Sequence, residues 1–136
     1  MNNLVVFDTN VFVSYLLPSK KISAVKTVVG RILTGSAIPV YSNEIMSEYE
    51  GVLNRTKFGF SSTKVHALLD SVFEKGFHVT PIETQVPFID ITDKCFYDAA
   101  RAAGDCWLIT GNKRHFPVEP FIVTAAEYLQ LTGGML

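Results

Sequence analysis

The sequence predicts an α/β fold in which helices cover both faces of a parallel-dominated central sheet. Short apolar runs alternate along the chain with longer segments whose apolar residues recur at helical spacing, a pattern typical of βαβ units. The first run, Leu4–Phe7, is continuously apolar, which is typical of a strand buried on both faces. Asp8 follows directly and would lie at the carboxyl end of that strand, where open α/β sheets bind their ligands.

Turn and capping residues divide the chain into these elements. The predicted strands cover 4–7, 37–41, 77–82, 106–110 and 120–123. The predicted helices cover 10–17, 23–33, 43–55, the segment between Ser61 and Gly76, 92–103 and 124–131.

Most of the helices have a start or stop signal of their own. Thr9 and Asn10 can cap the first helix, and Pro18 would end it. Ser42 is a good N-cap for the helix after the second strand. Thr124 with Glu127 forms a capping-box pattern at the start of the last helix. The remaining stops are glycines, at positions 35, 76 and 104.

Length and composition favour a single domain over residues 1–136. About 100–200 residues per domain is the usual range, and 48% hydrophobic with 18% charged residues excludes a disordered chain. The formal net charge of −1 gives no general attraction to nucleic acid or to a membrane. A phosphate-bearing partner would therefore need a local basic patch.

Targeting signals are missing from the sequence. Asp8 interrupts the N-terminal apolar run, which also lacks the features of a secretory signal, and no stretch approaches the ~18 apolar residues of a membrane span. Cys95 and Cys106 are too few for a disulfide scaffold and suit a reducing compartment. We therefore expect a soluble cytoplasmic protein that does not act at a membrane.

Parallel strands would bring several carboxylates to one edge of the sheet, because the loops after strands 4–7, 37–41 and 106–110 would open on the same side. The candidate acids are Asp8, Glu44, Glu48, Asp90, Asp93 and Asp98. Without histidine or cysteine partners, such a cluster favours Mg²⁺ or Mn²⁺, and this metal chemistry suits phosphoryl transfer. The sequence contains no glycine-rich nucleotide loop and no GxSxG turn.

Each acid also has a purely structural interpretation. Asp8 can end a strand and cap a helix. Glu48 borders the apolar face of its helix and can reach solvent, while Asp93 can interact with a helix dipole. Asp98 can pair with Lys94 or Arg101 on an exposed helix face. The histidines are scattered, and His66 and His78 are interpreted as structural.

Four segments carry a resemblance to a known family: Leu4–Val11, Ser42–Tyr49, Asp90–Ala100 and Leu108–Lys113. In this order and spacing the chain resembles PIN-domain ribonucleases, especially the bacterial branch that includes toxins of toxin–antitoxin systems. The resemblance implies a PIN-like three-layer α/β/α sandwich. It also implies a Mg²⁺- or Mn²⁺-dependent endoribonuclease, a hydrolase in which an activated water cleaves single-stranded RNA and leaves a 5′-phosphate.

The resemblance assigns roles to individual residues. Asp8, Glu48 and Asp93 would be the catalytic acids and metal ligands, and Asp98 is a substitute ligand that we rank below Asp93. The sequence departs from the family pattern at the fourth acid position, where Asn112 adds no charge. The supporting residues would be Thr9, Asn10, Thr110 and Asn112. Of these, Asn10 would hold Asp8 and Thr110 would orient groups of the site.

The partners follow from the same resemblance. Lys113 and Arg114 would bind the RNA backbone, because phosphate contacts dominate affinity for nucleic acid. A small antitoxin protein is the expected protein partner, and apolar helical faces allow a homodimer.

Two alternatives remain open from the sequence. Because Asn112 replaces an acid and the net charge is near zero, the chain can be a degenerate PIN domain that binds RNA or a partner without cleavage. The segment Phe7–Val11 also resembles the first motif of haloacid-dehalogenase-like phosphatases, in which the strand-end aspartate is the nucleophile. That family usually has a second aspartate where this chain has Asn10.

Overall fold

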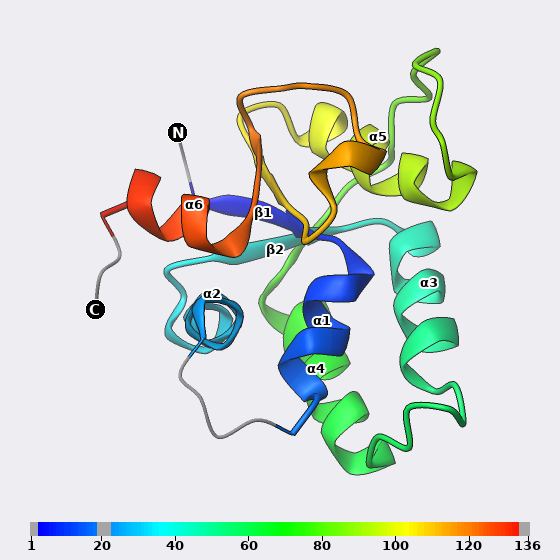
Figure 1. The fold of residues 1–136 in the computed structure, drawn as a ribbon, viewed down its shortest axis with the longest axis vertical. Coiled ribbons are helices and arrows are strands. Elements are labelled where there is room, and N and C mark those ends of the chain that lie inside the picture. Colours follow the sequence, from blue (N-terminus) through cyan, green and yellow to red (C-terminus); the bar gives the residue numbers. More distant parts are fainter. Residues whose placement is uncertain (1–2, 19–22, 134–136) are drawn as a thin grey trace.

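The computed structural model describes residues 3–18 and 23–133. Within this part of the chain, a five-stranded parallel sheet runs through the molecule in the order β3-β2-β1-β4-β5 (Figure 1). Strand β1 (Leu4–Phe7) occupies the centre and pairs with β2 (Ile38–Tyr41) and β4 (Trp107–Ile109). The edge strands are β3 (Phe77–His78) and β5 (Ile122–Val123). The α/β fold with a parallel sheet is therefore confirmed.

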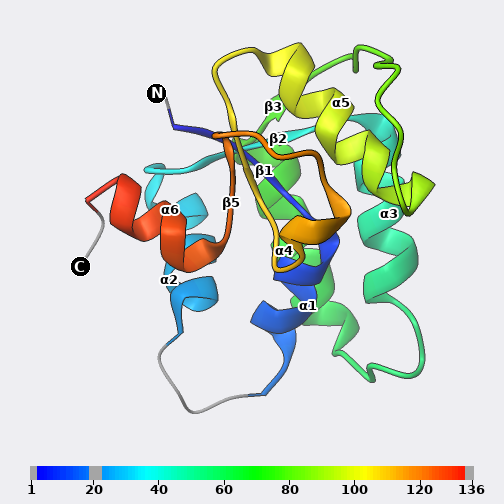
Figure 2. The ribbon, with the colours of Figure 1, turned by 45° about the horizontal axis from the view of Figure 1, so that its top comes forward.

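Helices lie on both sides of the sheet, which gives the expected three layers (Figures 1 and 2). One face is covered by α5 (Lys94–Ala103), which contacts β1, β2 and β4. The helices on the other face are α1 (Thr9–Leu16), α2 (Ala24–Thr34), α4 (Ser62–Lys75) and α6 (Ala125–Leu131). Helix α3 (Asn43–Leu53) lies beside the carboxyl ends of the strands and contacts both α1 and α5.

The central strand is apolar because both of its faces are covered. Val5, Val6 and Phe7 are fully buried, and Phe7 stacks on Phe12 of α1. Tyr49 of α3 packs its ring edge-on against Phe12 and donates a hydrogen bond from its hydroxyl to the carbonyl of Phe7. This contact fixes α3 against the end of β1, immediately before Asp8.

Predicted caps are confirmed at several helix ends. The hydroxyl of Ser42 accepts a hydrogen bond from the amide of Ile45, and Gly35 ends α2 in the left-handed conformation. Thr124 and Glu127 form the expected reciprocal capping box at the start of α6. Local sequence therefore sets these boundaries.

The predicted strand over 77–82 is wrong beyond His78. The amide of Val79 still donates to the carbonyl of Tyr41, but Pro81 has no amide hydrogen with which to extend the ladder. The predicted strand over 120–123 is also shorter than expected, since its first residue is Pro120 and only Ile122–Val123 is paired.

The predicted capping of the first helix by Thr9 and Asn10 is also wrong. Asp8 occupies the N-cap position without a side-chain capping bond, and Thr9 is already helical. The side chain of Asn10 turns back to Asp8 instead.

Within the described residues, no helix is long and apolar enough to cross a membrane.

Close packing at Gly76 provides a test of the topology. This residue joins α4 to β3, and a Cβ atom there would clash with the carbonyl of Val72 and lie 2.6 Å from the carbonyl of Pro39. We expect Gly76→Ala to lower the free energy of unfolding by about 2 kcal/mol or more. Gly51→Ala is the matched control, because its added Cβ would meet no atom of the described residues within 4 Å. Replacing this helical glycine by alanine should raise the free energy of unfolding by about 0.5–1 kcal/mol. Urea denaturation that ranks the two variants in the opposite order would contradict this packing.

Candidate active site

Asp8 is a buried carboxylate held between the ends of β1 and β4. Only 4% of the residue is exposed. Its Oδ2 atom accepts a hydrogen bond from the hydroxyl of Thr110 at 2.7 Å and one from the side-chain amide of Asn10 at 3.2 Å. Asn10 in turn accepts a hydrogen bond from the amide of Gly111 at 3.3 Å. The position of this carboxylate is therefore fixed by hydrogen bonds from two segments, the loop after β4 and the start of α1.

Burial makes the charge on Asp8 costly. Desolvation raises the pKa of Asp8 to about 6, the hydrogen bond from Thr110 opposes the rise, and the nearby negative charge of Asp93 adds to it. The hydrogen-bond donors from Thr110 and Asn10 are neutral. A bound cation would supply the positive charge that these donors lack.

Asp93 lies at the start of α5, where it occupies the N-cap position. Its pKa is raised by partial burial and by Asp90, while His115 opposes the rise. The Nδ1 atom of His115 lies 3.3 Å from Oδ2 of Asp93, and both ring nitrogens lie 3.2 Å from the side-chain nitrogen of Asn112. Asn112 therefore contacts a histidine that the sequence interpretation left without a role.

His115 could have been found from its position. It follows Asn112 by three residues, in a 3₁₀ turn over Lys113–His115, and the turn brings its ring back to the side chain of Asn112. The expectation of carboxylates without a histidine partner is therefore wrong for Asp93.

Glu48 is positioned by its neighbour on α3. Tyr49 is fully buried and bonded to the end of β1, so the adjacent Glu48 is carried to the same edge of the sheet, where its side chain is half-buried. Burial and the charge of Asp8 raise the pKa of Tyr49 well above its ordinary value, which keeps the phenol protonated as a donor. Nothing in the local sequence pattern around Tyr49 indicates this role.

Cys95 lies within the electrostatic influence of several of these acids. Its half-buried thiol lies in the first turn of α5. Burial raises the pKa of this thiol to about 12, with further increases from Glu48, Glu44, Asp8 and Asp93 in that order. Four carboxylates from three separate segments therefore act on one thiol. Cys106, the other free cysteine, is buried in the sheet.

Asp98 differs from the other predicted ligands because protein groups already bind both of its oxygens. Lys94 donates to Oδ2 at 2.7 Å, and Thr84 donates to Oδ1 from its hydroxyl at 2.6 Å and from its amide at 3.3 Å. The predicted pairing with Lys94 is confirmed, but Asp98 is only 7% exposed and does not lie on an open helix face. Its contacts tie the loop before η1 (Ile91–Asp93) to α5.

A pocket of about 760 Å³ opens between the start of α3 and the start of α5. We call it the acidic pocket. Glu44, Glu48 and Asp98 line it together with Cys95 and Lys94. Most of its lining charge is negative, so the pocket by itself favours a cation over a bare phosphate.

The side chains fit a hard divalent cation in chemistry and charge. Asp93 is close enough to Asp8 to raise its pKa, and the hydroxyl oxygen of Thr9, the next residue, is buried without a hydrogen-bond partner among the described residues. Among residues 3–18 and 23–133, however, no three His, Cys, Asp or Glu side chains already form a group that could hold a metal ion. An ion would therefore have to draw the carboxylates together.

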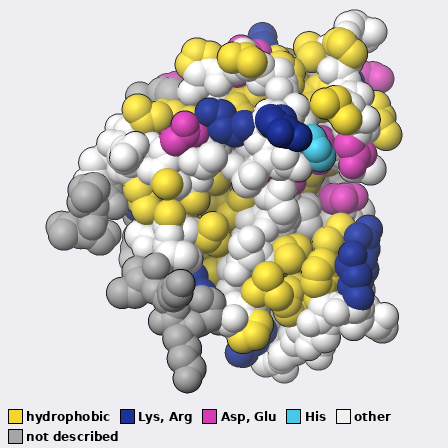
Figure 3. Space-filling view, viewed as in Figure 1, with side chains coloured by type: hydrophobic (Ala, Val, Ile, Leu, Met, Phe, Trp, Pro, Cys, Tyr) yellow, Lys and Arg dark blue, Asp and Glu magenta, His cyan; other side chains and the backbone are white. Residues whose placement is uncertain are grey.

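Basic side chains lie on the rim beside this site. Lys113 and Arg114 occupy the 3₁₀ turn that also contains His115. Lys113 forms an exposed ion pair with Glu127 at 3.1 Å, and Arg114 is exposed as well. Basic side chains, a histidine and acidic side chains lie next to one another on the face shown in Figure 3.

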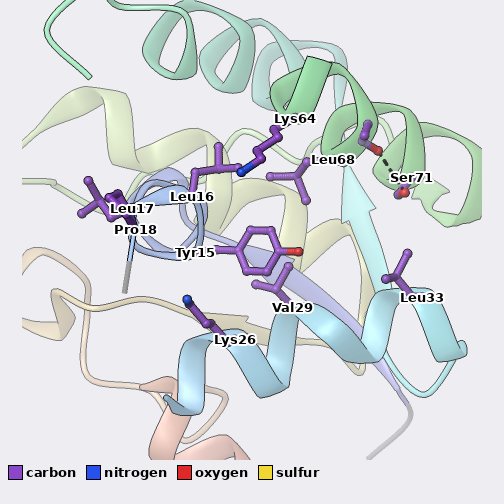
Figure 4. A pocket seen from close by; sticks show the side chains of 11 residues that line it. Tyr15, Leu16, Leu17, Pro18, Lys26, Val29, Leu33, Lys64, Leu68 and Ser71 are labelled. Carbon is purple, nitrogen blue, oxygen red and sulfur yellow. Dashed lines mark hydrogen bonds between the residues drawn. The ribbon is translucent and has the colours of Figure 1, made fainter. Parts of the chain in front are cut away.

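A second surface feature lies away from the acids. An apolar groove of about 720 Å³ runs between α1, α2 and α4, and Tyr15, Val29 and Leu68 project into it from the three helices (Figure 4). Leu33 lines the groove and is 63% exposed. Lys64 also lines it, from α4. We call this feature the helical groove.

The raised pKa of Asp8 predicts how the stability of the metal-free protein depends on pH. Protonated Asp8 contributes stability that is fully present below pH 3.8, the pKa of the group in the unfolded chain. This contribution is lost as the pH rises through about 6, the pKa in the folded protein. The side chain in Asp8→Asn cannot ionise. In EDTA, the free energy of unfolding of this variant relative to wild type should therefore rise by about 2 kcal/mol between about pH 4.5 and about pH 7.5. Urea denaturation measures the difference. Asp70→Asn, at an exposed position on α4, is the control, and a pH-independent difference for Asp8→Asn would contradict the account.

Comparison with known proteins agrees with this geometry. Residues 4–114 match the family model of the PIN domain, a range that includes Asp8, Glu48, Asp93 and the loop after β4. No curated protein matches the chain. The chain belongs to the PIN-domain family, whose members are typically nucleases and generally use divalent metal ions.

Proposed function

We propose that this protein is a Mg²⁺- or Mn²⁺-dependent endoribonuclease that hydrolyses single-stranded RNA. The observation that carries the proposal is the buried carboxylate of Asp8, whose hydrogen-bond donors Thr110 and Asn10 are neutral, at the edge of the sheet where α3 with Glu48 and the start of α5 with Asp93 also lie. When bound, the metal would activate a water and neutralise charge on the phosphate. Membership of a nuclease family supports the same reaction class.

The protein groups have distinct tasks in this proposal. Asp8, Glu48 and Asp93 would hold the ion, and Thr110 with Asn10 orients Asp8 through hydrogen bonds to a single oxygen. Asp98 is the least available of the predicted ligands, since Lys94 and Thr84 already occupy its oxygens. The proposed metal site therefore uses three carboxylates, those of Asp8, Glu48 and Asp93, and not all of the acids that are candidates from the sequence.

Lys113 and Arg114 would bind the RNA backbone at the rim. Their turn ends the loop that begins after β4 with Thr110, and it also contains His115, which contacts Asp93, so a phosphate bound there would lie next to this acid. Because Glu127 already pairs with Lys113, we assign the larger share of phosphate binding to Arg114. RNA affinity should fall with salt through these contacts.

Incubation of the purified protein with a panel of single-stranded RNAs tests the activity. We expect cleavage with 5′-phosphate products in Mn²⁺ or Mg²⁺ and none in EDTA. Asp8→Asn and Glu48→Gln should each lower kcat/KM by about 100-fold or more, because each removes a charged ligand. The double change of Lys113 and Arg114 to alanine should mainly raise KM.

Two controls separate this outcome from a contaminating nuclease. Glu44→Gln changes an acid one turn away from Glu48 in the same pocket and should retain most activity. Lys75→Ala removes an exposed cation at the end of α4, next to the start of β3 and thus at the opposite edge of the sheet. Equal traces of cleavage in wild type and Asp8→Asn would refute the enzyme, and RNA binding without any product would favour the degenerate PIN domain.

We further propose that the protein is the toxin of a toxin–antitoxin pair and that a small antitoxin docks in the helical groove. The groove offers apolar side chains from three helices, and the exposed ammonium group of Lys64 stands at its border. This chemistry is complementary to a segment that carries apolar residues and flanking acids. Leu16, at the end of α1, also lines the groove, so a docked segment would contact the helix that begins beside Asp8.

Growth of a bacterial host tests this pairing. Induced wild type should arrest growth, Asp8→Asn should not, and co-expression of a small protein encoded by an adjacent gene should relieve the arrest. Leu33→Glu should remain toxic but escape relief, because it places a charge in the groove. Phe73→Glu is the matched control, since Phe73 is similarly exposed, at 64%, but lies outside the groove. Relief of Leu33→Glu equal to that of wild type would exclude the groove, and light scattering would show whether a second copy of the chain occupies it.

A further inference from the structure

The loop after β4 connects Asp8 to Asp93 through an unbroken series of contacts. The hydroxyl of Thr110 donates to Asp8 and accepts a hydrogen bond from the amide of Asn112 at 2.9 Å. The side chain of Asn112 lies 3.2 Å from the ring of His115, whose Nδ1 lies 3.3 Å from Asp93. One short segment therefore contacts Asp8 through Thr110 and Asp93 through His115.

Asn112 stands at the middle of this series with both its backbone and its side chain engaged. Its amide reaches toward Asp8 through Thr110, and its carbonyl accepts a hydrogen bond from the amide of His115 at 3.0 Å, which closes the 3₁₀ turn. Its side chain faces the imidazole of His115. These contacts place the side-chain nitrogen of Asn112 against the histidine.

The contact between His115 and Asp93 is partly buried. The side chain of Asp93 is 15% exposed, whereas that of His115 is 37% exposed. A hydrogen bond to a mostly covered carboxylate restricts its rotation more than a solvated surface pair does. Nδ1 of His115 contacts Oδ2 of Asp93, so the imidazole would orient the carboxylate through one oxygen while the other oxygen would serve as the ligand.

We propose that His115 and Asn112 form a positioning pair that holds the Asp93 carboxylate in place for metal binding. The proposal rests on the proposed function, because it treats Asp93 as a metal ligand. It predicts that the pair acts on metal affinity and not on the affinity for RNA. His115 is thus a positioning residue that acts through Asp93.

Calorimetric titration with Mn²⁺ alone tests the pair without any activity measurement. His115→Ala should weaken Mn²⁺ binding by about 10-fold or more, as is typical when a partner of a metal ligand is lost. His115→Gln, which keeps a hydrogen-bond donor, should recover most of this loss. His66→Ala, at an exposed position on α4, is the matched control and should bind Mn²⁺ as wild type does.

A double-mutant cycle in EDTA tests the contact when no metal is present. The stability cost of Asp93→Asn should be smaller in the His115→Ala background than in wild type, and Asn112→Ala should be non-additive with His115→Ala. Additive effects would overturn the proposal, as would unchanged Mn²⁺ affinity in His115→Ala or an equal loss in His115→Gln, which would indicate direct ligation by the ring. If wild type binds no Mn²⁺ while the cycle still shows coupling, the contact stands and the proposed metal-dependent function fails.

Discussion

The hydrogen bond from Thr110 to Asp8 joins the ends of the two central strands, and the arrangement of the site depends on it. Thr110 is fully buried and Asp8 nearly so, which means that the carboxylate has lost most of its hydration. Neutral donors recover part of that loss but leave the pKa of Asp8 near 6. The fold thus maintains a carboxylate whose charge is only partly stabilised by the protein, and a cation is the natural complement.

The sheet topology explains why the other groups meet there. Because β1, β2 and β4 are parallel neighbours, the segments that follow them begin at one edge and bring Asp8, α3 and the Thr110 loop together. Tyr49 then fixes α3 against β1, and the start of α5 carries Asp93 and Cys95 to the same place. The negative charge so assembled is large for a chain whose net charge is only −1, and it is concentrated at one edge of the sheet.

The parts that sequence predicted well are those governed by local rules. Continuous apolar residues in β1, the cap at Ser42 and the capping box at Thr124 each act within a few residues, so their patterns identify the elements directly. The metal-ligand roles of the acids remain a prediction. The errors arose where tertiary contacts decide the outcome: Asn10 bonds to Asp8 and the Gly111 loop instead of capping, and Asp98 is buried by Thr84 from a distant loop. His115 gains its role only because a 3₁₀ turn folds it back onto Asn112 and Asp93.

The central claim is that Asp8, Glu48 and Asp93 form one divalent-metal centre. The most direct measurement is anomalous diffraction from crystals soaked in Mn²⁺, collected for wild type and for Asp8→Asn. The account predicts a peak within ligand distance of Asp8 and Asp93 in wild type, with the Asp93 carboxylate still in contact with His115, and loss of that peak in the variant. A well-ordered site that remains empty at saturating Mn²⁺, or a peak that persists unchanged in Asp8→Asn, would contradict it.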